Sequence, residues 1–341
     1  NVRRQGRAIE QLPLANRSRD VWGRLKELIG EDVELLLSGH LRVGYRPVHA
    51  ERMEAYARDA QPYGLDLQMM TAKAVRERFP FLGPEVTAGC YAPHDGHANP
   101  RLAAPAFGRA AVREGAQVFE NTEIVHIEKA GEDFQVQAAD GRNFASPVVL
   151  VTAGAWGDRI SAAFGEPVPL QVKGPQMCVT EPVPYAIAPT IGLATDVPEE
   201  IVYFRQVARG NIVIGGGYRS KPDMLNRRAY VEPRSILNQI RQMRRLLPGA
   251  ENLNIIRVWS GIESYLPDSL PIMGPSGKVD GLYYAFGFCG HGFQLGPGVG
   301  DVMAELISTG STSTLISPFD IRRFTQPSTV PANAPTTGKL I

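Results

Sequence analysis

The sequence predicts an α/β domain interlocked with an antiparallel layer, and three observations support this fold class. Residues 148–151 are apolar at every position, which is typical of a strand buried on both faces of a parallel sheet. A second apolar run, 282–286, leads into a glycine-rich segment and then into helical spacing. Between these runs, residues 165–257 form short strand-like stretches punctuated by proline, as expected of an antiparallel layer inserted into an α/β domain.

The other elements follow from the spacing of apolar residues and from turn residues. Helices are expected at 14–29, 50–60, 71–79, 102–114, 232–247 and 301–307. Strands are expected at 86–92, 117–119, 122–128, 169–180, 201–206, 211–218 and 254–259, with a strand, a turn and a second strand within 35–44. Thr71 is the expected cap of its helix, and Asp140-Gly141 is the expected turn of a hairpin.

The composition of the 341 residues is that of an ordinary globular protein, with 43% hydrophobic residues. Lys and Arg number 36 and Asp and Glu 35, so the net charge of +1 argues against nucleic acid or an anionic membrane as the main partner. No apolar stretch reaches the roughly 18 residues that a membrane span needs. Cys90, Cys178 and Cys289 lie far apart, which predicts reduced thiols and a cytoplasmic location.

The segment Gly287–Gly300 is the centre of the functional prediction. Six of its fourteen positions are glycine, and it joins a strand to a helix expected to begin near Asp301. Glycines let the backbone approach a ligand, and the free N–H groups of a helix N-terminus stabilise negative charge. The segment therefore predicts a binding site for an anionic group, with a tight strand-to-helix connection as the alternative.

The loop at 93–100 contains His94, Asp95 and His97, a pattern that can indicate a metal site. Proline and glycine make this stretch a loop rather than a helix face, and no cluster of further ligands stands near it in the sequence. We therefore expect a hydrogen-bonded turn beneath a cavity and no metal.

Three motifs stand in a fixed order along the chain: Val149–Trp156, Trp259–Ile262 followed by Pro267–Gly274, and Gly290–Gln294. Together they resemble the D-amino-acid oxidase superfamily of FAD enzymes, in the branch of glycine oxidase and sarcosine oxidase. Within that branch the sequence is most similar to the flavin subunits of hydrogen cyanide synthase, opine oxidase and D-amino-acid dehydrogenase.

The resemblance implies a Rossmann-like FAD-binding domain of the glutathione-reductase type, interlocked with an antiparallel-sheet substrate domain. The implied FAD-binding domain is discontinuous and spans residues 1–37, 98–166 and 258–324. The implied substrate domain spans 38–97 and 167–257, and 325–341 is expected to be a disordered tail.

The family opens with a strand, a G-x-G-x-x-G turn and an acidic residue, and the sequence contains no such unit. Gly215–Gly217 and Gly296–Gly300 lack the spacing and context of that motif. By similarity, Asn1 lies just past the unit. The resemblance therefore implies that an N-terminal dinucleotide-binding unit of roughly 30 residues is missing, which leaves open whether this chain binds FAD as given.

The resemblance assigns non-covalent FAD to this chain and names the residues that would hold it. Ile124 would contact the adenine through its backbone. Lys173 stands where heterotetrameric sarcosine oxidases attach FMN to a histidine, so no covalent flavin is expected. We expect Cys289 to be neither a flavin anchor nor a nucleophile. The residues implied to lie against the flavin are Thr152, Ala153, Gly154, Trp156, Gly261, Ile262, Gly290, His291, Gly292, Phe293 and Gln294.

Family members oxidise a C–N bond by hydride transfer to flavin N5, and arginine usually holds the substrate carboxylate. Arg4 and Arg7 are the first candidates for this role, with ordinary helix-entry charge as the alternative. Tyr203 and Arg205 are the second.

Two positions depart from the family pattern. Gln294 replaces the carboxylate-binding lysine of monomeric sarcosine oxidases, and Glu263 replaces an arginine of glycine oxidases. Simple glycine or sarcosine specificity is therefore not expected. Glu263 is a candidate partner for a second cationic group, as in an opine or a guanidino-bearing substrate.

The leading functional prediction is the FAD-bearing subunit of an amino-acid or opine dehydrogenase that acts on a D-amino acid, glycine or an opine. Partner subunits are implied, and these could bring peripheral membrane association. One alternative is a self-sufficient oxidase of the glycine or sarcosine type that uses O2. Another is a fragment that keeps the fold without tight FAD.

Overall fold

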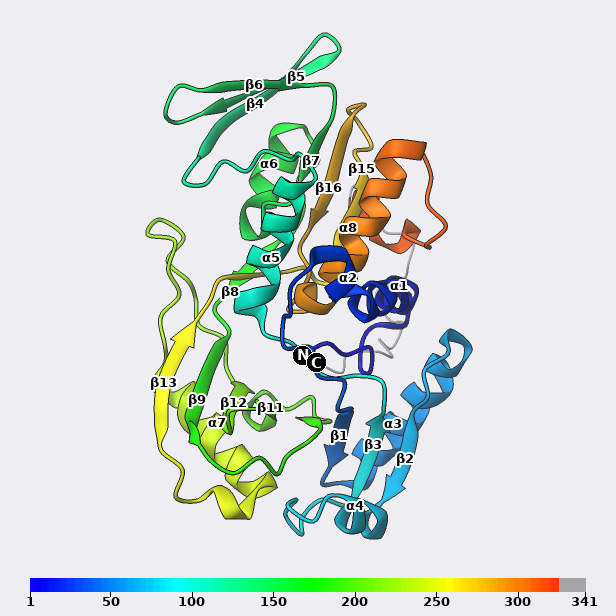
Figure 1. Ribbon diagram of the computed structural model, residues 1–341, viewed down its shortest axis with the longest axis vertical. Helices are drawn as coiled ribbons and strands as arrows, with labels where there is room; N and C mark the ends of the chain where they lie inside the picture. Colours follow the sequence, from blue (N-terminus) through cyan, green and yellow to red (C-terminus); the bar gives the residue numbers. More distant parts are fainter. Residues whose placement is uncertain (325–341) are drawn as a thin grey trace.

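The computed structural model describes residues 1–324, and the tail predicted for 325–341 lies outside them. An eight-stranded sheet with the order β13-β9-β12-β11-β10-β1-β3-β2 fills the lower half of Figure 1. Its strands β1 and β10 are parallel, and the other neighbours are antiparallel. Its strands are β1 (His40–Gly44), β2 (Gln68–Thr71), β3 (Ala88–Ala92), β9 (Gln176–Pro182), β10 (Thr190–Leu193), β11 (Val202–Gln206), β12 (Asn211–Gly216) and β13 (Ile255–Ser260).

One face of this sheet is the larger hydrophobic core. Along β11, Val202 and Phe204 are buried in that core, whereas Tyr203 and Arg205 lie on the opposite face. Helix α7 (Pro233–Leu246) covers the core face with its apolar side, and α4 (Ala72–Arg78) extends the cover. Thr71 caps α4 as predicted, because its Oγ1 accepts the N–H of Ala74 at 3.3 Å.

The upper half of Figure 1 contains a three-stranded sheet with the order β15-β16-β7. Strands β7 (Val149–Val151) and β16 (Leu282–Phe286) are parallel, and β15 (Ile272–Pro275) is antiparallel to β16. Within residues 1–324, β7 is an edge strand and Leu150 is 37% exposed. The parallel pairing that its apolar run predicts is present, but the burial on both faces is wrong for the described chain.

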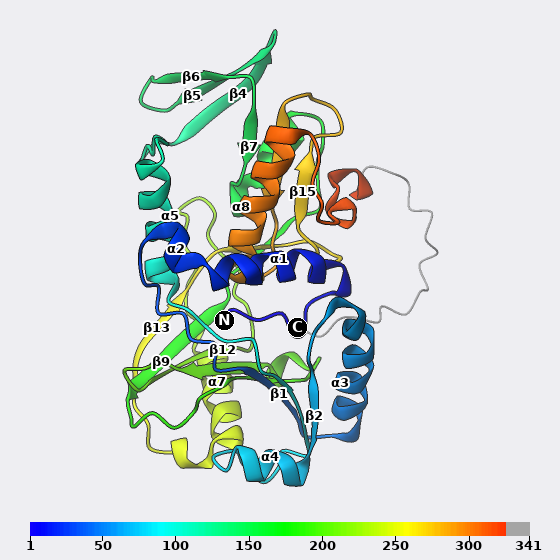
Figure 2. The same ribbon diagram turned by 45° about the vertical axis from the view of Figure 1, so that its right-hand side comes forward.

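A third sheet lies at the end of the molecule farthest from the eight-stranded sheet (Figures 1 and 2). It consists of β4 (Ile124–Ala130), β5 (Asp133–Ala138) and β6 (Asn143–Ser146), all antiparallel. The hairpin turn predicted at Asp140-Gly141 is confirmed, because β5 and β6 pair directly across it. The strand predicted at 117–119 is wrong, since that stretch is irregular between a helix and β4.

The remaining bounds refine the predicted helices. The helix predicted at 14–29 is two helices that meet at Arg24. The strand predicted within 35–37 is absent from the structure, where Leu36 forms only an isolated β-bridge with His97. The two remaining strands, β8 (Gln171–Lys173) and β14 (Glu263–Tyr265), pair with each other. The helices are α1 (Leu12–Gly23), α2 (Leu25–Ile29), α3 (Pro47–Ala60), α5 (Pro100–Arg113), α6 (Gly157–Ala163) and α8 (Gly292–Thr309). These findings confirm a mixed α/β fold with one large sheet, whereas the predicted domain boundaries stay a prediction.

Helix α8 begins at Gly292, nine residues before the predicted start at Asp301. Its glycines and Pro297 disfavour a helix intrinsically, but packing against α1 overrides that preference. The Ser18 hydroxyl of α1 accepts the N–H of Gly298 at 3.0 Å and donates to the carbonyl of Gln294 at 2.5 Å. Trp22 also donates to that carbonyl, at 2.9 Å.

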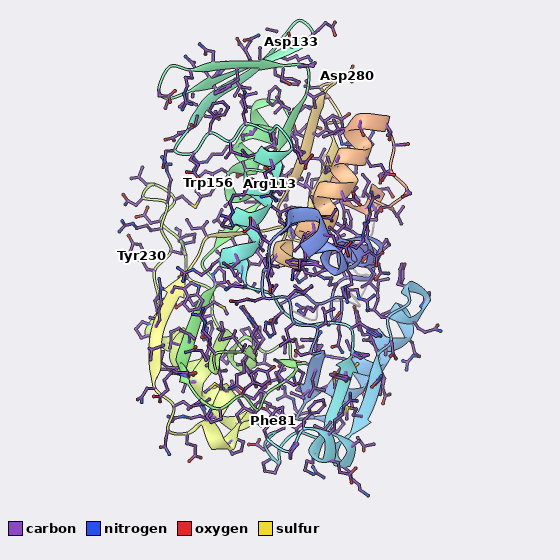
Figure 3. The ribbon with its side chains drawn as sticks, in the orientation of Figure 1. Phe81, Arg113, Asp133, Trp156, Tyr230 and Asp280 are labelled. Carbon is purple, nitrogen blue, oxygen red and sulfur yellow. The ribbon has the colours of Figure 1, made fainter. Side chains whose placement is uncertain are left out.

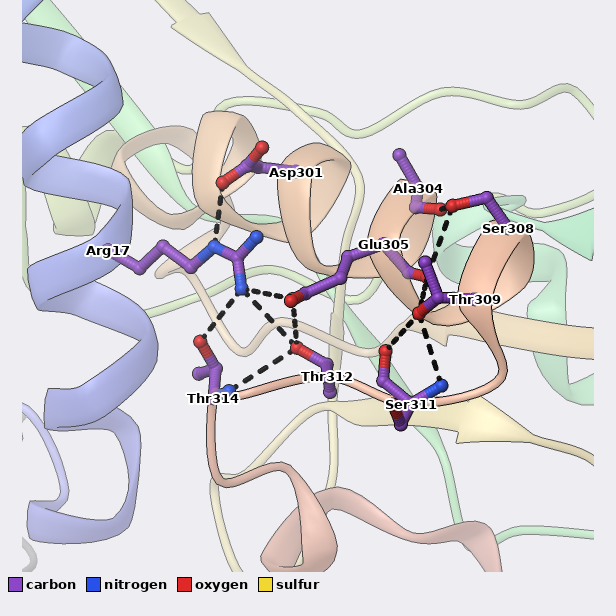
Figure 4. Close-up of polar contacts among 9 residues, drawn as sticks. All are labelled: Arg17, Asp301, Ala304, Glu305, Ser308, Thr309, Ser311, Thr312 and Thr314. Carbon is purple, nitrogen blue, oxygen red and sulfur yellow. Dashed lines mark hydrogen bonds and ion pairs between the residues drawn. The ribbon is translucent and has the colours of Figure 1, made fainter.

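Farther along the same interface, Arg17 of α1 is a second tie to α8. Its Nε lies 2.6 Å from Asp301 and its Nη1 lies 2.5 Å from Glu305 (Figure 4). The same Nη1 donates to the hydroxyls of Thr312 and Thr314, in the segment that follows α8. Tertiary contacts therefore hold α8 both near its start and along its length.

Replacing Gly298 by alanine is expected to destabilise the protein by about 1–3 kcal/mol, the usual range for overpacking. A Cβ at this position would lie 2.6 Å from the Cβ of Ser18 and 2.7 Å from its Cα, so the two helices would have to separate. The matched control is Gly300→Ala on the same helix, where a Cβ would meet no atom within 4 Å. Urea unfolding of both variants measures the difference, and equal midpoints would show that the close approach of α1 and α8 contributes nothing.

Candidate active site

A cavity of about 380 Å³ lies between the free face of the eight-stranded sheet and the start of α8. Figures 1 and 2 both place the beginning of the chain, residues 1–7, between α1 and this sheet. The cavity is lined by Asn1, Arg3 and Arg7 from that segment, by His40 and Arg42 from β1, by Tyr203 and Arg205 from β11, by Arg219, by Trp259, Glu263 and Tyr265, and by Gly290, His291, Phe293 and Gln294. Its volume is within the range of small-molecule sites.

The floor of the cavity is one row of residues that face each other across neighbouring strands. Arg42 is opposite Gly192, Gly192 is opposite Tyr203, and Tyr203 is opposite Gly215. A Cβ on Gly215 would lie 2.4 Å from the Tyr203 ring and 2.4 Å from the sulfur of Met177. The two glycines therefore leave room above the sheet for the Tyr203 side chain and for a ligand.

Five arginines line the cavity: Arg3, Arg7, Arg42, Arg205 and Arg219. No carboxylate within residues 1–324 forms an ion pair with any of them. Burial lowers the pKa of Arg7 to about 9 and that of Arg42 to about 10. The cavity is thus a strongly cationic, poorly hydrated environment.

Two of these arginines have buried nitrogen atoms with no hydrogen-bond partner among the described residues. The atoms are Nη1 of Arg7 and Nε of Arg205. Because an unpaired buried donor is costly, such atoms at the wall of a cavity indicate a position for an acceptor on a ligand. Arg7, Tyr203 and Arg205 were predicted as substrate residues, and the structure brings them to one cavity.

Arg4, the other arginine predicted from this segment, does not line the cavity. It donates to the side chain of Asn16 at 3.0 Å and lies 3.6 Å from a carboxylate oxygen of Asp95. Asp95 also accepts the backbone N–H of Gln5 at 3.0 Å. Its own N–H donates to the carbonyl of Ala92 at 3.4 Å, so the loop contains a hydrogen-bonded turn, and its predicted place beneath a cavity stays a prediction. Within residues 1–324, no group of three or more His, Cys, Asp or Glu side chains is placed to hold a metal.

Two histidines face the cavity with the same arrangement of partners. Gln11 donates to the carbonyl of Ser269 at 3.2 Å, so its side-chain oxygen accepts the Nδ1–H of His291 at 3.0 Å. His40 donates in the same way to Gln5 at 2.7 Å, and Gln5 donates to the carbonyl of Cys90 at 3.0 Å. Burial and neighbouring arginines hold the pKa of both histidines well below the usual value, so each ring is neutral and its Nε2 carries no proton.

Glu263 is the carboxylate among the lining residues. The Tyr265 hydroxyl donates to its Oε2 at 2.6 Å, and a Cβ on Gly290 would lie 3.3 Å from the same oxygen. The guanidinium of Arg219 lies 4.4 Å from the centre of the Tyr265 ring. Burial, with Glu263 adding to it, raises the pKa of Tyr265, so this hydroxyl stays a hydrogen-bond donor.

The N-terminal end of α8 opens beside this cationic cavity. Gly290 has a φ of +80°, a conformation that favours glycine. His291 is the N-cap residue of the 18-residue helix α8, so the start of this helix lies at the cavity. Residues 2–306 match the family model for DAO, described as FAD dependent oxidoreductase. The chain belongs to the DAO family of FAD-dependent oxidoreductases.

Similar proteins span nearly the whole chain. A glycine oxidase from Geobacillus kaustophilus is 28% identical over 92% of this chain and 81% of its own length. One subunit of the opine oxidase from Rhizobium meliloti is 26% identical over 90% of this chain and 80% of its own length. The crystal structure of L-proline dehydrogenase from P. horikoshii superposes with a TM-score of 0.87 at 26% identity, covering 95% of this chain and 86% of that structure.

The residues around the cavity fit the flavin that defines the DAO family. The start of α8 directs free backbone N–H groups and a positive dipole end at the cavity, where a flavin accumulates negative charge on reduction. Gln294 donates to the carbonyl of Ala15 at 3.0 Å, and its buried Oε1 has no partner among the described residues. An orphaned acceptor next to a helix N-terminus fits a polar ring that offers both donors and acceptors.

The predicted flavin residues fall into three groups in the structure. Gly290, His291, Phe293 and Gln294 line the cavity. Gly292 instead lines a second, mainly apolar cavity of about 540 Å³, which Val21, Trp22, Ala103, Phe107 and Phe293 share. Gly261 and Ile262 lie between two lining residues, Trp259 and Glu263, and a Cβ on Gly261 would meet no atom within 4 Å.

The third group lies at the carboxyl end of β7. Thr152 is exposed, and Ala153, Gly154 and Trp156 are partly buried in a short turn of helix packed beside β14. In Figure 3, Trp156 lies between the level of Asp133, in the remote β4–β6 sheet, and the eight-stranded sheet. Ile124, predicted to contact the adenine, is 42% exposed at the start of β4, away from the cavity. These positions suit a cofactor as long as FAD, and their roles stay predictions.

Cys289 is buried next to the cavity and is held by its neighbours. Its thiol donates to the carbonyl of Gly287 at 3.1 Å and accepts the N–H of Leu266 at 3.3 Å. Burial raises its pKa to about 11, so it is a thiol and not a thiolate. This environment supports the prediction that Cys289 is neither a nucleophile nor a flavin anchor.

Several lining residues with polar side chains were not predicted from the sequence, among them Arg3, His40, Arg42, Arg219 and Tyr265. Arg42 and His40 alternate with apolar residues in a short strand, and that alternation is a signal that places both on one face. No sequence signal distinguishes Arg3 from Arg4, because the two are neighbours in an irregular segment.

No helix within residues 1–324 is long and apolar enough to span a membrane.

Proposed function

We propose that this protein is the FAD-bearing subunit of a dehydrogenase that oxidises a C–N bond of an amino acid or a secondary amine. The bound flavin would accept a hydride at N5, and the resulting imine would be hydrolysed by water. The observation that carries the proposal is the pair of arginine nitrogens, on Arg7 and Arg205, that have no hydrogen-bond partner within residues 1–324, in a cavity onto which α8 opens. A carboxylate next to an amine is a ligand that satisfies such donors.

In this proposal the chain binds and orients the substrate and supplies no strong base. Tyr203 and Arg205 of β11 hold the substrate carboxylate, because both project from the same face of the sheet. Glu263 is the available partner for a cationic group of the substrate, either its amine or a second group. The neutral His291 presents Nε2 as an acceptor for an N–H of the substrate, which orients the nitrogen.

The role as a subunit is supported by the similarity to the opine oxidase of Rhizobium meliloti, because the relative's name marks it as one part of a multi-subunit enzyme. An amino-acid or opine substrate would agree with that relative and with the glycine oxidase. A self-sufficient oxidase that uses O2 is the alternative, since glycine oxidases are similar over the same length.

Mixing the purified flavoprotein with candidate amines in the absence of oxygen tests the proposal. Loss of the visible flavin absorbance with glycine, N-methylglycine, proline or an opine is the expected result. Admitting O2 afterwards separates the two enzyme types, because an oxidase recovers its colour rapidly and a dehydrogenase needs an artificial electron acceptor. A flavin-loaded protein that no amine reduces would overturn the proposal, and a protein that retains no flavin would favour the fragment that keeps the fold without tight FAD.

A further inference from the structure

Strand β13 is an edge of the eight-stranded sheet, and it is exposed along its whole length. Within residues 1–324 it pairs on one side only, with β9, and none of its six side chains is buried. Ile256 is 60% exposed, and Val258 and Trp259 are exposed as well. The strand at the other edge, β2, exposes one large apolar side chain, that of Met69. An edge with unpaired backbone groups and exposed apolar side chains is a place where another chain can add a strand.

The backbone groups that face the open edge follow from the pairing of β13 with β9. The N–H of Gly261 donates to the carbonyl of Pro175 at 3.2 Å, and the same register continues without interruption to Arg257. Successive residues of an antiparallel strand direct their N–H and C=O groups to opposite sides. The groups of Val258 and Ser260 therefore point away from β9, and the open edge offers two donors and two acceptors to a further strand.

The connection between β12 and α7 extends this surface through its residues 218–231. A Cβ on Gly174 would lie 3.1 Å from the Cβ of Ala229 and 3.2 Å from the hydroxyl oxygen of Ser260, so this loop lies against the end of β13. Tyr230, the residue after Ala229, is exposed, and Figure 3 shows it on the same side of the molecule as β13. We call the exposed residues of β13 and of this loop the β13 surface.

The charge of the β13 surface is one-sided, although the charge of the whole chain is nearly balanced. Residues 218–231 and 255–260 contain five cationic side chains and one carboxylate, that of Asp223. The cationic residues are Arg219, Lys221, Arg227, Arg228 and Arg257. Arg227 pairs with Glu123 at 2.8 Å, and the other four form no ion pair within residues 1–324. A chain that covers this surface therefore has to bring carboxylates, because cations that lose their water without a counter-charge are costly.

A second copy of this chain is a poor match for the β13 surface. A symmetric pair would bring the same surface of both copies together, so that the cations of one copy would face those of the other. The register with β9 also shifts at Ile256, which marks a β-bulge. Bulges and charged residues on an edge strand are devices that prevent identical edges from pairing. The exposed apolar side chains are thus left for a different chain with acidic residues.

The β13 surface is continuous with the wall of the cavity. Trp259 of β13 lines the cavity and is also exposed on the surface. Arg219, near the start of the loop, lines the cavity too. A chain that binds to the β13 surface would therefore lie directly beside the cavity and close that side of it.

We propose that the β13 surface is the docking site of the partner subunit, which adds a strand with acidic side chains to the edge of β13. The inference rests on the subunit role in the proposed function, and it assigns the surface and the chemistry of the partner. Backbone hydrogen bonds at Val258 and Ser260 would fix the register of the added strand. Carboxylates of the partner would pair with Arg257 and with the cations of the loop.

Photo-cross-linking of the full-length chain, in the cells that naturally produce it, tests the position of the partner. Benzoylphenylalanine replaces Ile256, Tyr230 or Leu237 in turn. Leu237 is the matched control, because it is 66% exposed on α7, outside the β13 surface. Positions 256 and 230 should cross-link to the same polypeptide, and position 237 should not. A cross-link to a second copy of this chain, or no cross-link from either position of the β13 surface, would overturn the inference.

Affinity measurements with the polypeptide identified in this way provide the second test. Val258→Pro removes an N–H that points to the open edge and leaves the hydrogen bonds to β9 in place, so it should weaken binding roughly 5- to 10-fold. Val258→Thr, which keeps that N–H, is its control. Arg257→Glu should weaken binding by a similar factor and reduce its dependence on salt, whereas Arg209→Glu, in the turn after β11, should not.

Flavin reduction separates this inference from the proposed function. Val258 and Arg257 do not line the cavity, so both variants should be reduced by the amine at the unaltered rate in the absence of oxygen. Unchanged affinity of both variants for the partner would overturn the docking surface, while reduction by the amine would leave the oxidation of a C–N bond standing. Failure of every amine to reduce the flavin would count against the proposed function instead.

Discussion

Replacing Arg205 by glutamine is expected to lower kcat/KM for the amine substrate by roughly 10- to 150-fold, because the neutral amide loses charged hydrogen bonds to the carboxylate. Its Nε is buried without a hydrogen-bond partner among the described residues, and Arg205 projects with Tyr203 from β11 into the cavity. Arg205→Lys should recover part of the loss, since it keeps the charge but not the planar fork. Steady-state kinetics of flavin reduction measures both variants.

The stability of the same variant separates a binding role from a structural one. Burial lowers the pKa of Arg205, which shows that the folded protein bears a cost for its charge. Arg205→Gln should therefore leave the free energy of unfolding unchanged or raise it, while the activity falls. Arg209→Gln, an exposed arginine in the turn after β11, is the matched control. If Arg205→Gln kept full activity, the carboxylate site would have to be sought at Arg7 instead.

Replacing His291 by alanine is expected to weaken FAD retention and to slow flavin reduction at saturating substrate by roughly 10-fold or more, as expected for the loss of a positioned hydrogen-bonding group. The ring is not a cap for α8, since its side chain makes no capping hydrogen bond and instead binds Gln11. Its neutral Nε2 is thus available at the cavity. Single-turnover mixing and equilibrium release of flavin measure the two effects.

The pH dependence adds a second check on His291. Burial lowers the pKa of His291 well below its usual value, and the charges of Arg7, Arg3 and Arg219 lower it further. The imidazole is therefore neutral at and above neutral pH, and any titration seen there should persist in His291→Ala. Unchanged flavin content together with an unchanged reduction rate would leave the ring with only a loop-fixing role through Gln11.

Much of the architecture could be predicted because its signals are local. The cap at Thr71 and the hairpin at Asp140-Gly141 depend on a few neighbouring residues. The alternation along β11 is enough to assign Tyr203 and Arg205 to one face of a strand. The start of α8 could not be predicted, because glycine and proline disfavour a helix locally and the contacts with α1 that compensate, such as that of Gly298 with Ser18, come from a distant part of the chain.

The same distinction applies to the site. The order of the motifs by itself identified a flavin enzyme of the DAO family. Gly290–Gln294 and the two motifs before it are runs of consecutive residues, so they can be recognised in the sequence without the structure. Only the tertiary structure decided that Arg3, and not Arg4, lines the cavity, and that Arg42 lies two strands from Tyr203. The physical reason is that charge balance in a cavity depends on which side chains converge through space, and residues from β1, β11 and the first seven positions meet there although they are far apart in the chain.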